Sequence, residues 1–440
     1  MYRYSIIGLG KLGASIAAAI ASRGHRVIGV DQDEEVVKLI NAGRAPVHET
    51  GLDKLIAAHR GNLRATTNYR EAICETDLTF VIVPTPSNEQ GGFSLDYVAP
   101  AFVQIGAALE HKSGYHLVCL TSTLLPGATR TDLLPVLEAK SGKVCGRDFG
   151  LCYSPTFIAL GTAVQDFLHP DFNLIGEFDE RSGSLLVTAY AEILPQLTEC
   201  RRMTIENAEL AKISLNSYVT MKITFANMLA DLCERVPGGD VDIVTAAIGL
   251  DKRIGQKYLT GALGYGGPCF PRDNLAFDYF ARSVGTKAEL AQTVDRLNRV
   301  LPEAVLARLG VTVAPGETVA VLGLGYKPQS HITEASQGLM LARVLARQGA
   351  RVIAHDPLLE KFAANELNDD NIVLKSLNDC LQEASTVVIA NPDPAYASLE
   401  ASDFAITNGP VTVVDCWRML APKLSQHPKI VYSPIGRSRK

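Results

Sequence analysis

The stretch YSIIGLGKLG, residues 4–13, decides the fold of the N-terminal part of the chain. It predicts a strand, a glycine turn and the start of a helix, whose small apolar residues run over 14–21. A second strand is predicted over 26–30 and ends at Asp31. This order of elements predicts a βαβ unit of a doubly wound, parallel α/β sheet.

The glycines of this turn and the acidic residue after the second strand each have a physical role. Gly8 makes the tight turn, Gly10 lets the backbone approach a pyrophosphate at the helix N-terminus, and Gly13 permits close packing of helix on strand. Asp31 can accept hydrogen bonds from a ribose 2′-OH and would repel a 2′-phosphate. The motif therefore predicts NAD as the cofactor rather than NADP.

Two further apolar runs, 79–83 and 116–120, extend the predicted sheet, and each is followed by a loop that carries hydroxyl groups. Thr85 lies in the first loop and Thr123 in the second. The carboxyl ends of parallel strands form the ligand crevice of an open α/β sheet. Taken alone, each threonine is as consistent with a turn-forming role as with binding.

The opening pattern recurs near the C-terminus as VAVLGLGYKP, residues 319–328. Gly323 and Gly325 match the first two glycines of the motif, but Pro328 stands where the third is expected. We therefore expect two Rossmann-like halves, of which only the first binds a dinucleotide.

Composition narrows the class of protein. The chain has 440 residues, 47% of them hydrophobic and 20% charged, with a net charge of −5. This balance predicts a globular protein with a small-molecule partner and argues against a nucleic-acid or membrane surface. The nine cysteines form no CxxC pair, and no export signal or membrane span is recognisable, so we expect a cytoplasmic protein without a metal site.

A long helix is predicted over 206–234, because this stretch contains neither proline nor glycine and its apolar residues are spaced as on a helix. Lys212 and Asn216 are four residues apart and share a face of it. A solvated helix face is the default interpretation of such a pair.

A turn-rich loop, GALGYGGPCFP at 261–271, interrupts the helical region. It carries Cys269, and Asp273 follows four residues later. A cysteine in a glycine-rich loop beside a charged group can be a nucleophile, whereas most cysteines are buried and inert.

Taken together, these motifs resemble the UDP-glucose/GDP-mannose dehydrogenase family along essentially the whole chain. The specific part of the resemblance is the order of the blocks, which are GLGKLG, Asp31, VPTP, STLLPG, ELAKISLN, GYGGPCFPRD, GLGYKP and DCWR.

The resemblance implies a four-electron oxidation in which the C6 alcohol of a nucleotide hexose becomes a carboxylate, with two NAD used in turn. Cys269 would hold the intermediate aldehyde as a thiohemiacetal and then as a thioester. Lys212 and Asn216 would stabilise the developing oxyanion. Asp273, with Thr123, would hold the water or act in proton transfer.

The resemblance also implies two binding sites. The cofactor would be bound by Gly8, Gly10, Lys11, Leu12, Gly13, Asp31, Thr85 and Thr123. The nucleotide sugar would be bound by Thr156, Phe157, Ile158, Lys212, Asn216, Arg253, Tyr265, Gly266, Lys327 and Arg418.

The same resemblance implies a homodimer and a division of the chain. Arg253 matches an arginine that reaches the active site of the neighbouring subunit, while Lys327 and Arg418 match positions that bind the nucleotide diphosphate. We expect an NAD-binding domain at 1–200, a helical dimerisation and active-site segment at 201–305, and a UDP-sugar-binding domain at 306–440, the outer two Rossmann-like.

The chain departs from the family pattern in the block SPTFIAL, residues 154–160. Thr156 replaces a glutamate proposed as the general base of thioester hydrolysis, and Leu160 replaces a second glutamate. Loss of general-base catalysis slows a step by about 10²–10⁴-fold. Either another base such as Asp273 takes over, or the enzyme accumulates aldehyde or thioester.

The segment 327–336 also lacks the arginine and paired aspartates that are common in the family. UDP-glucose is the preferred substrate, and a UDP-N-acetylhexosamine is the alternative within the same class. A binding protein that has lost catalytic power is a second interpretation, which the joint presence of Lys212, Asn216, Cys269 and Asp273 opposes. A two-electron hydroxy-acid dehydrogenase is a third, and it would have no use for Cys269.

Overall fold

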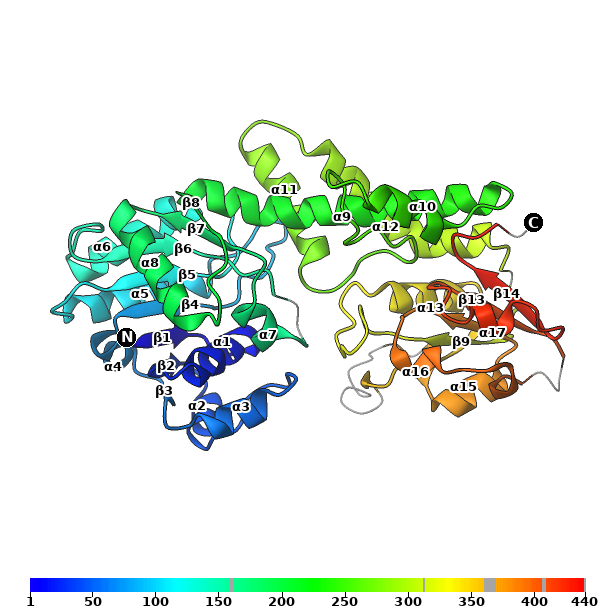
Figure 1. The fold of residues 1–440 in the computed structure, drawn as a ribbon, viewed down its shortest axis with the longest axis horizontal. Helices are drawn as coiled ribbons and strands as arrows, with labels where there is room; N and C mark the ends of the chain where they lie inside the picture. The colour runs from blue at the N-terminus through cyan, green and yellow to red at the C-terminus, as the bar shows by residue number, and fades with distance from the viewer. Residues whose placement is uncertain (159–160, 312, 360–368, 370, 406–408, 439–440) are drawn as a thin grey trace. The chain divides into compact units, whose positions relative to one another are not determined.

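The structure is a computed structural model that describes residues 1–158, 161–311, 313–359, 369, 371–405 and 409–438. The chain folds into two compact units, Met1–Ser214 and Leu215–Lys440. Each unit is built on its own β-sheet with helices on both faces (Figure 1).

The first unit contains an eight-stranded sheet in the order β3-β2-β1-β4-β5-β6-β7-β8. All neighbouring strands are parallel except β6 and β7. The strands are β1 (Tyr4–Ile7), β2 (Val27–Val30), β3 (Leu63–Thr66), β4 (Leu78–Val81), β5 (Leu117–Leu120), β6 (Gly150–Tyr153), β7 (Asn173–Glu177) and β8 (Cys200–Thr204).

Two apolar layers bury this sheet. One face packs against α1 (Lys11–Ser22), α2 (Glu34–Asn41), α3 (Leu52–Ala58), α7 (Ala163–Leu168) and α8 (Glu180–Ile193). The other packs against α4 (Tyr69–Glu75), α5 (Val98–Glu110), η1 (Thr129–Leu133) and α6 (Leu134–Ser141). The small residues of α1 are buried without a break from Gly13 to Ala21, so this helix can lie close to the strands.

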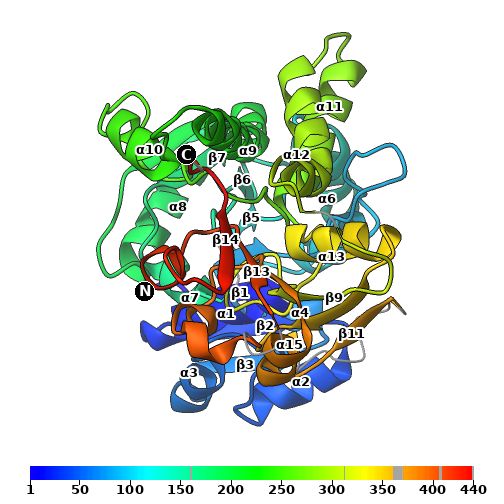
Figure 2. The ribbon, with the colours of Figure 1, turned by 90° about the vertical axis from the view of Figure 1, so that its right-hand side faces the viewer.

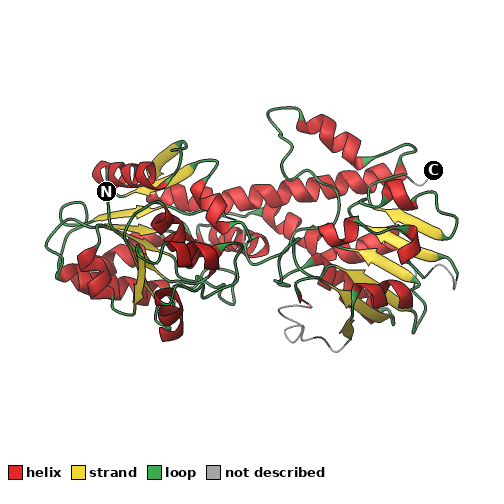
Figure 3. Cartoon of the chain, turned by 60° about the horizontal axis from the view of Figure 1, so that its bottom comes forward, coloured by secondary structure: helices red, strands yellow, loops and turns green. Residues whose placement is uncertain are grey.

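The second unit contains a six-stranded parallel sheet in the order β11-β10-β9-β12-β13-β14. Figure 2 gives a second view of the ribbon, and Figure 3 draws the strands in yellow. The strands are β9 (Thr318–Leu322), β10 (Arg351–His355), β11 (Ile372–Leu374), β12 (Thr386–Ile389), β13 (Val411–Asp415) and β14 (Ile430–Pro434).

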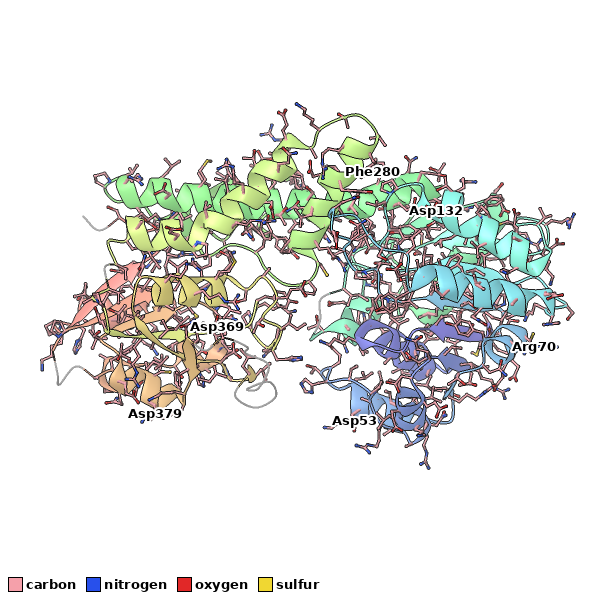
Figure 4. The ribbon with its side chains drawn as sticks, turned by 180° about the vertical axis from the view of Figure 1, so that it is seen from behind. Asp53, Arg70, Asp132, Phe280, Asp369 and Asp379 are labelled. Carbon is pink, nitrogen blue, oxygen red and sulfur yellow. The ribbon has the colours of Figure 1, made fainter. Side chains whose placement is uncertain are left out.

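Helices cover both faces of the second sheet as well. One apolar layer includes residues of α10 (Val241–Gly249), α12 (Glu289–Arg308) and α13 (Gln337–Arg347). The other includes α15 (Leu377–Glu383), α16 (Pro394–Ala397), η3 (Ala401–Asp403) and α17 (Ala421–Leu424). The 31-residue α9 (Ile205–Arg235) contains the boundary between the units, and α11 (Phe270–Ser283), marked by Phe280 in Figure 4, belongs to the second unit.

The predicted fold class is confirmed: two Rossmann-like α/β halves and a long helix are present. One detail predicted for the second half was wrong. The third glycine of the repeated motif is Gly338 and not the residue at position 328. Gly338 packs the helix closely against the strand turn, as Gly13 does in the first half, and an insertion after Gly325 separates it from the first two glycines. A Cβ built on Gly338 would lie 2.1 Å from the Gly323 carbonyl oxygen, as one on Gly13 would lie 1.8 Å from that of Gly8.

Within the described ranges, we find no helix with the length and apolar character that a bilayer crossing requires. The three-part division at residues 200 and 305 stays a prediction.

Candidate active site

The glycine turn of the first unit leaves room for a ligand at one position and is tightly packed at two others. Gly8 has φ +91°, and a Cβ there would lie 2.4 Å from the Ile82 carbonyl oxygen. Gly10 precedes α1 and is exposed, with no atom within 4 Å of a built Cβ. The open backbone therefore coincides with the helix N-terminus, where a pyrophosphate is stabilised.

Asp31 stands at the end of β2, beside this turn. Its Oδ2 accepts the backbone N–H of Leu9 at 2.7 Å, and its Oδ1 accepts that of Asp33 at 3.0 Å. These bonds fix a half-buried carboxylate next to the phosphate turn, as recognition of a ribose diol requires. Lys11 and Leu12, both half-buried, form the first turn of α1. The residues present thus fit NAD.

The two hydroxyl-bearing loops are bonded to each other where β4 and β5 end. Thr85 Oγ1 donates to the Thr123 carbonyl oxygen at 2.8 Å. Ser122 Oγ donates to the Val83 carbonyl oxygen at 2.7 Å and accepts the Val83 N–H at 3.0 Å. Ser122 was not among the predicted site residues, although it opens the second loop.

Glu209 on α9 holds the far end of the second loop and was also not predicted. It is fully buried, and its carboxylate accepts the N–H of Gly127 at 2.6 Å and of Thr129 at 3.0 Å. Burial raises the pKa of this carboxyl, while the hydrogen bonds from Thr129 and Gly127 oppose the shift. Its position three residues before Lys212, on the same helix face, is the signal that could have identified it.

Lys212 contacts the block 154–158, part of the stretch in which the sequence departs from the family pattern. Its Nζ donates to the Thr156 carbonyl oxygen at 2.7 Å and lies 4.5 Å from the centre of the Phe157 ring. The lysine is only 8% exposed, so the default interpretation of a solvated face was wrong for it. Thr156, Phe157 and Ile158 are half-buried, whereas Leu160 lies outside the described residues.

In the second unit, Cys269 occupies the N-cap position of α11 and is the exposed member of the nine cysteines. The N-terminus of a helix favours negative charge, as on a thiolate. One turn later, the Asp273 N–H donates to the Cys269 carbonyl oxygen at 2.8 Å. Asn216 Nδ2 donates to Asp273 Oδ2 at 2.6 Å, and both side chains are buried. In the second unit, Asn216 is therefore bonded to Asp273, which lies one helical turn after Cys269.

Buried amides hold the glycine loop before Cys269. Asn227 accepts the Ala262 N–H at 2.9 Å through Oδ1. Asn298 accepts the Tyr265 N–H and donates to the Tyr265 carbonyl oxygen, both at 2.9 Å. The Tyr265 hydroxyl accepts a bond of 3.0 Å from Asn274. The loop is therefore ordered by side chains of three helices, which its own sequence could not reveal.

The loop also contacts the segment that follows β9. The Gly267 N–H donates to the Glu334 carbonyl oxygen at 2.8 Å, and the ring of Tyr326 packs over Gly267. A Cβ on Gly266 would lie 2.5 Å from the Ala335 carbonyl oxygen. Gly266 has no room for a side chain because the backbone of Ala335 is so close, and Gly267 is favoured by its φ of +82° and by the Tyr326 ring above it.

A crevice lies at the carboxyl ends of β9, β12 and β13, where an α/β sheet binds its ligand. Lys327 lines it, as do Leu263, Gly264, Gln337, Asn391 and Trp417. The predicted nucleotide-binding residue Lys327 is therefore placed at a crevice of the expected kind.

Arg253 and Arg418 are placed very differently. The side chain of Arg253 is 88% exposed and pairs with Asp251 at 2.6 Å in its own loop. The side chain of Arg418 is 2% exposed and pairs with Asp242 at 2.8 Å. Nucleotide binding by Arg418 stays a prediction, and its guanidinium is engaged by protein groups in this structure.

No group of three or more potential metal-ligating side chains is found in the part of the chain that the structure describes.

The glycine turn and the two α/β sheets, whose strands are parallel except for β6 and β7, define a class, the dehydrogenases with a Rossmann-like cofactor domain. Family models of the UDP-glucose/GDP-mannose dehydrogenase family match the chain in order: the NAD binding domain at residues 2–194, the central domain at 206–300 and the UDP binding domain at 320–422. The chain belongs to this family, and its cofactor is NAD.

Individual relatives agree with this placement. The chain is 36% identical to the UDP-glucose 6-dehydrogenase AglM of Haloferax volcanii, over 90% of this chain and 92% of the relative. It is 33% identical to the GDP-mannose 6-dehydrogenase of Azotobacter vinelandii, over 90% and 93%. The solved UDP-glucose dehydrogenase of Pyrobaculum islandicum matches with a TM-score of 0.87 and 33% identity, over 100% of this chain and 98% of that one.

Proposed function

We propose that this chain oxidises the C6 hydroxyl of a UDP-hexose, UDP-glucose first, to the carboxylate, with Cys269 as covalent nucleophile. The observation that carries the proposal is the exposure of Cys269 at the N-cap of α11, with the buried Asn216–Asp273 pair one turn away. A thiol at a helix N-terminus and beside polar groups has the surroundings of a reactive cysteine.

Gly10 would receive the pyrophosphate of NAD at the N-terminus of α1, in the turn that Gly8 and Gly13 make possible by their close packing. Asp31 would bind a ribose hydroxyl of the cofactor. When bound, NAD supplies a hydride acceptor for the sugar C6 carbon. Lys11 and Leu12 form the first turn of the same helix, and Thr85 and Thr123 lie at the neighbouring strand ends.

In the proposed mechanism the C6 alcohol first loses its hydroxyl proton and a hydride, which a bound NAD would accept, and becomes the aldehyde. The Cys269 sulfur then attacks the aldehyde carbon, a carbon–sulfur bond forms as the thiol proton is lost, and the carbonyl electron pair moves to oxygen, which takes up a proton. Loss of this hydroxyl proton and of a second hydride, to a second NAD, turns the thiohemiacetal into a thioester. Water then attacks the thioester carbon, the carbon–sulfur bond breaks, and the carboxylate leaves. The Lys212 ammonium and the Asn216 amide would donate to the oxygen as its charge develops.

Hydrolysis is the step for which the family's glutamate is missing. The Thr156 hydroxyl cannot act as a base near neutral pH. The backbone carbonyl oxygen of Thr156 accepts a hydrogen bond from Lys212. Asp273 is the carboxylate that the second unit places one turn from Cys269, so we propose it as the base. If Asp273 serves poorly, the thioester accumulates.

The test counts NADH formed per sugar consumed across UDP-glucose, UDP-N-acetylhexosamines and GDP-mannose. We expect two NADH per UDP-glucose, with turnover lost in Cys269→Ser and retained in the matched control Cys200→Ser. One NADH per sugar, with Cys269→Ser as active as the native enzyme, would overturn the mechanism. Activity on no nucleotide sugar would favour a binding protein.

Intact-mass analysis after mixing enzyme, NAD and substrate tests the hydrolysis step. If Asp273 is an efficient base, free uronate forms and no adduct persists on Cys269. A stable sugar adduct would instead indicate slow hydrolysis, and Asp273→Asn should increase the adduct if Asp273 is the base.

The proposed homodimer has support on α9. Tyr218, Phe225, Met228 and Leu232 are between 45% and 55% exposed and recur at spacings typical of one helix face. We expect Phe225→Asp to yield monomers by size-exclusion chromatography with light scattering, and Val431→Asp on β14 to leave the dimer intact.

We propose that Arg253 acts across that dimer, because it stands at the position of the family's arginine that reaches the neighbouring subunit and because its side chain is exposed. Mixing inactive Arg253→Ala and Cys269→Ser dimers, with exchange of subunits, should then restore activity, since one mixed site contains both native residues. Without recovery, the two residues would belong to the same subunit's site. The three-domain division is supported by the order and spans of the family models.

A further inference from the structure

Arg418 has an unusual backbone conformation that the surrounding structure enforces. It follows β13 with φ +61°, in the left-handed region that non-glycine residues rarely adopt. The carboxylate of Asp415 shapes this turn, because it accepts the N–H of Trp417 at 3.0 Å and of Leu420 at 2.8 Å. The Tyr432 hydroxyl donates to the same carboxylate at 2.8 Å. Backbone strain of this kind persists where it positions a functional side chain.

The strained turn separates two neighbouring side chains. Trp417 lines the crevice at the ends of β9, β12 and β13. Arg418 instead forms a bidentate pair with Asp242 on α10, with Nε and Nη2 each 2.8 Å from a carboxylate oxygen. The positive charge of Arg418 is therefore neutralised by a protein carboxylate.

The remaining nitrogen of Arg418 reaches the loop that carries Cys269. Nη1 donates to the carbonyl oxygen of Gly261 at 2.6 Å and of Ile435 at 3.0 Å. Gly261 has no room for a side chain, because a built Cβ would lie 2.5 Å from the Ala226 carbonyl oxygen and 2.7 Å from Val241. The first residue of the loop is thus fixed from two sides.

We propose that Arg418 is a positioning residue: through the Gly261 carbonyl it fixes the origin of the loop that presents Cys269, and it is not a ligand of the nucleotide diphosphate. The proposal deepens the function proposed above, since it takes Cys269 as the nucleophile. Asn227 continues the same restraint at the next residue, where its Oδ1 accepts the Ala262 N–H.

Such positioning affects chemistry more than binding. A displacement of a reacting group by about 1 Å slows a reaction on the order of 10²-fold. A lysine at position 418 keeps the charge but cannot form the bidentate pair and reach Gly261 together. The substitution should therefore separate the loss of kcat from any loss of nucleotide affinity.

The experiment compares full-length native enzyme with Arg418→Lys in three measurements. We expect kcat to fall on the order of 10- to 100-fold, and the alkylation rate of Cys269 by iodoacetamide, measured by mass spectrometry without ligand, to fall several-fold. The dissociation constant of UDP, from calorimetry, should stay within about twofold. The alkylation result does not require the proposed reaction, so it remains informative even if Cys269→Ser proves active.

Two further variants separate positioning from folding. Asp242→Asn weakens the same bidentate pair from its half-exposed partner, and should reproduce the smaller kcat and slower alkylation in part. Arg437→Gln is the matched control: Arg437 also pairs with Asp240 at 2.9 Å and with Asp242 at 3.3 Å, whereas the bond to Gly261 comes from Arg418. We expect it to keep native kcat and native alkylation.

Weaker UDP binding by tenfold or more in Arg418→Lys, with native Cys269 alkylation, would overturn the proposal in favour of a phosphate ligand. Native values of all three measurements would also overturn it. If Arg418→Lys does not fold, the Asp242→Asn data decide by the same criteria.

Discussion

Each of the two Rossmann-like halves of this chain has the same kind of glycine turn, but the surroundings of its second glycine differ between the halves. Gly8 and Gly323 have φ +91° and +98°, and Gly13 and Gly338 pack against their carbonyl groups. Over Gly10 the space is open, whereas a Cβ on Gly325 would lie 2.2 Å from the Ser330 carbonyl oxygen. The fold of the turn is therefore retained in both halves, and the backbone approach of a pyrophosphate is open only in the first.

The acidic residue after the second strand is also more accessible in the first half than in the second. Asp31 is half-buried and accepts the N–H groups of Leu9 and Asp33. Asp356 is 4% exposed, and its carboxylate accepts four backbone N–H groups, those of Leu324, Gly325, Leu358 and Leu359. The Asp31 carboxylate is therefore partly available to a ribose, whereas the Asp356 carboxylate is fully used in holding its turn.

The largest expected effect comes from filling the shared packing position. Gly13→Ala and Gly338→Ala each place a methyl group against a backbone oxygen that cannot move away. Each should lower the free energy of unfolding by about 3 kcal/mol, the upper end for overpacked sites. Thermal unfolding measures this, with Gly114→Ala, where a Cβ meets nothing within 4 Å, as the control. Equal stability of all three variants would mean that the turns do not share this constraint.

The paired acids should separate stability from cofactor choice. Asp356→Asn leaves two of four buried N–H groups without a carboxylate oxygen and should destabilise by about 2–3 kcal/mol. Asp31→Asn leaves one N–H group instead of two without an acceptor, so it should destabilise less, by about 1 kcal/mol. It should also raise the ratio of kcat/KM for NADP to that for NAD by about tenfold, because repulsion of the 2′-phosphate is removed. Chemical unfolding and initial rates check the two results. A stability loss in Asp31→Asn as large as that in Asp356→Asn would contradict the comparison.

Acid should destabilise the first half through His116. Burial lowers the pKa of this imidazole to about 3, and nearby Lys112 contributes. Its folded pKa lies below its unfolded value of about 6.5, so only the unfolded state takes up a proton as pH falls through that value. Unfolding should become easier by about 2 kcal/mol between pH 7 and pH 5. His116→Gln should flatten this dependence in urea titrations, and an unchanged slope would exclude His116 as its source.

The smallest effect distinguishes the two second glycines. Gly10 has φ −67°, which alanine adopts, so Gly10→Ala should fold with native stability. Its methyl group would occupy the space that a pyrophosphate needs, and KM for NAD should rise about tenfold, or about 1.4 kcal/mol. Gly325→Ala should instead lower the unfolding midpoint and leave KM for NAD unchanged. The comparison fails if both variants behave alike.

Local patterns predicted most of the fold because each element carries its own signal. The glycine motifs, the strand ends and the helix of 206–234 were found within a few residues of β1, α1, β2 and α9. The role of Gly338 was missed because the insertion after Gly325 breaks the expected spacing, and closeness of helix and strand is a property of the fold.

The residues of the candidate site could be predicted from the sequence, but the side chains that hold its loops in place could not. Cys269, Lys212 and Asp273 stood in motifs, whereas Glu209, Asn227 and Asn298 lie far along the chain from the loops they hold. Hydrogen bonds across such separations leave no local pattern in the sequence.

The sequence by itself determined the turns, the repeated βαβ order and the placement of the chemically able residues, since these depend on local conformational preference. The tertiary structure alone decided that the space over Gly10 is open and that over Gly325 is filled. It also decided that Asp356 holds its turn through four N–H groups and that Arg418 faces Asp242 and Gly261. Burial and close approach of distant segments fix those outcomes, and neither is encoded in any single stretch of the chain.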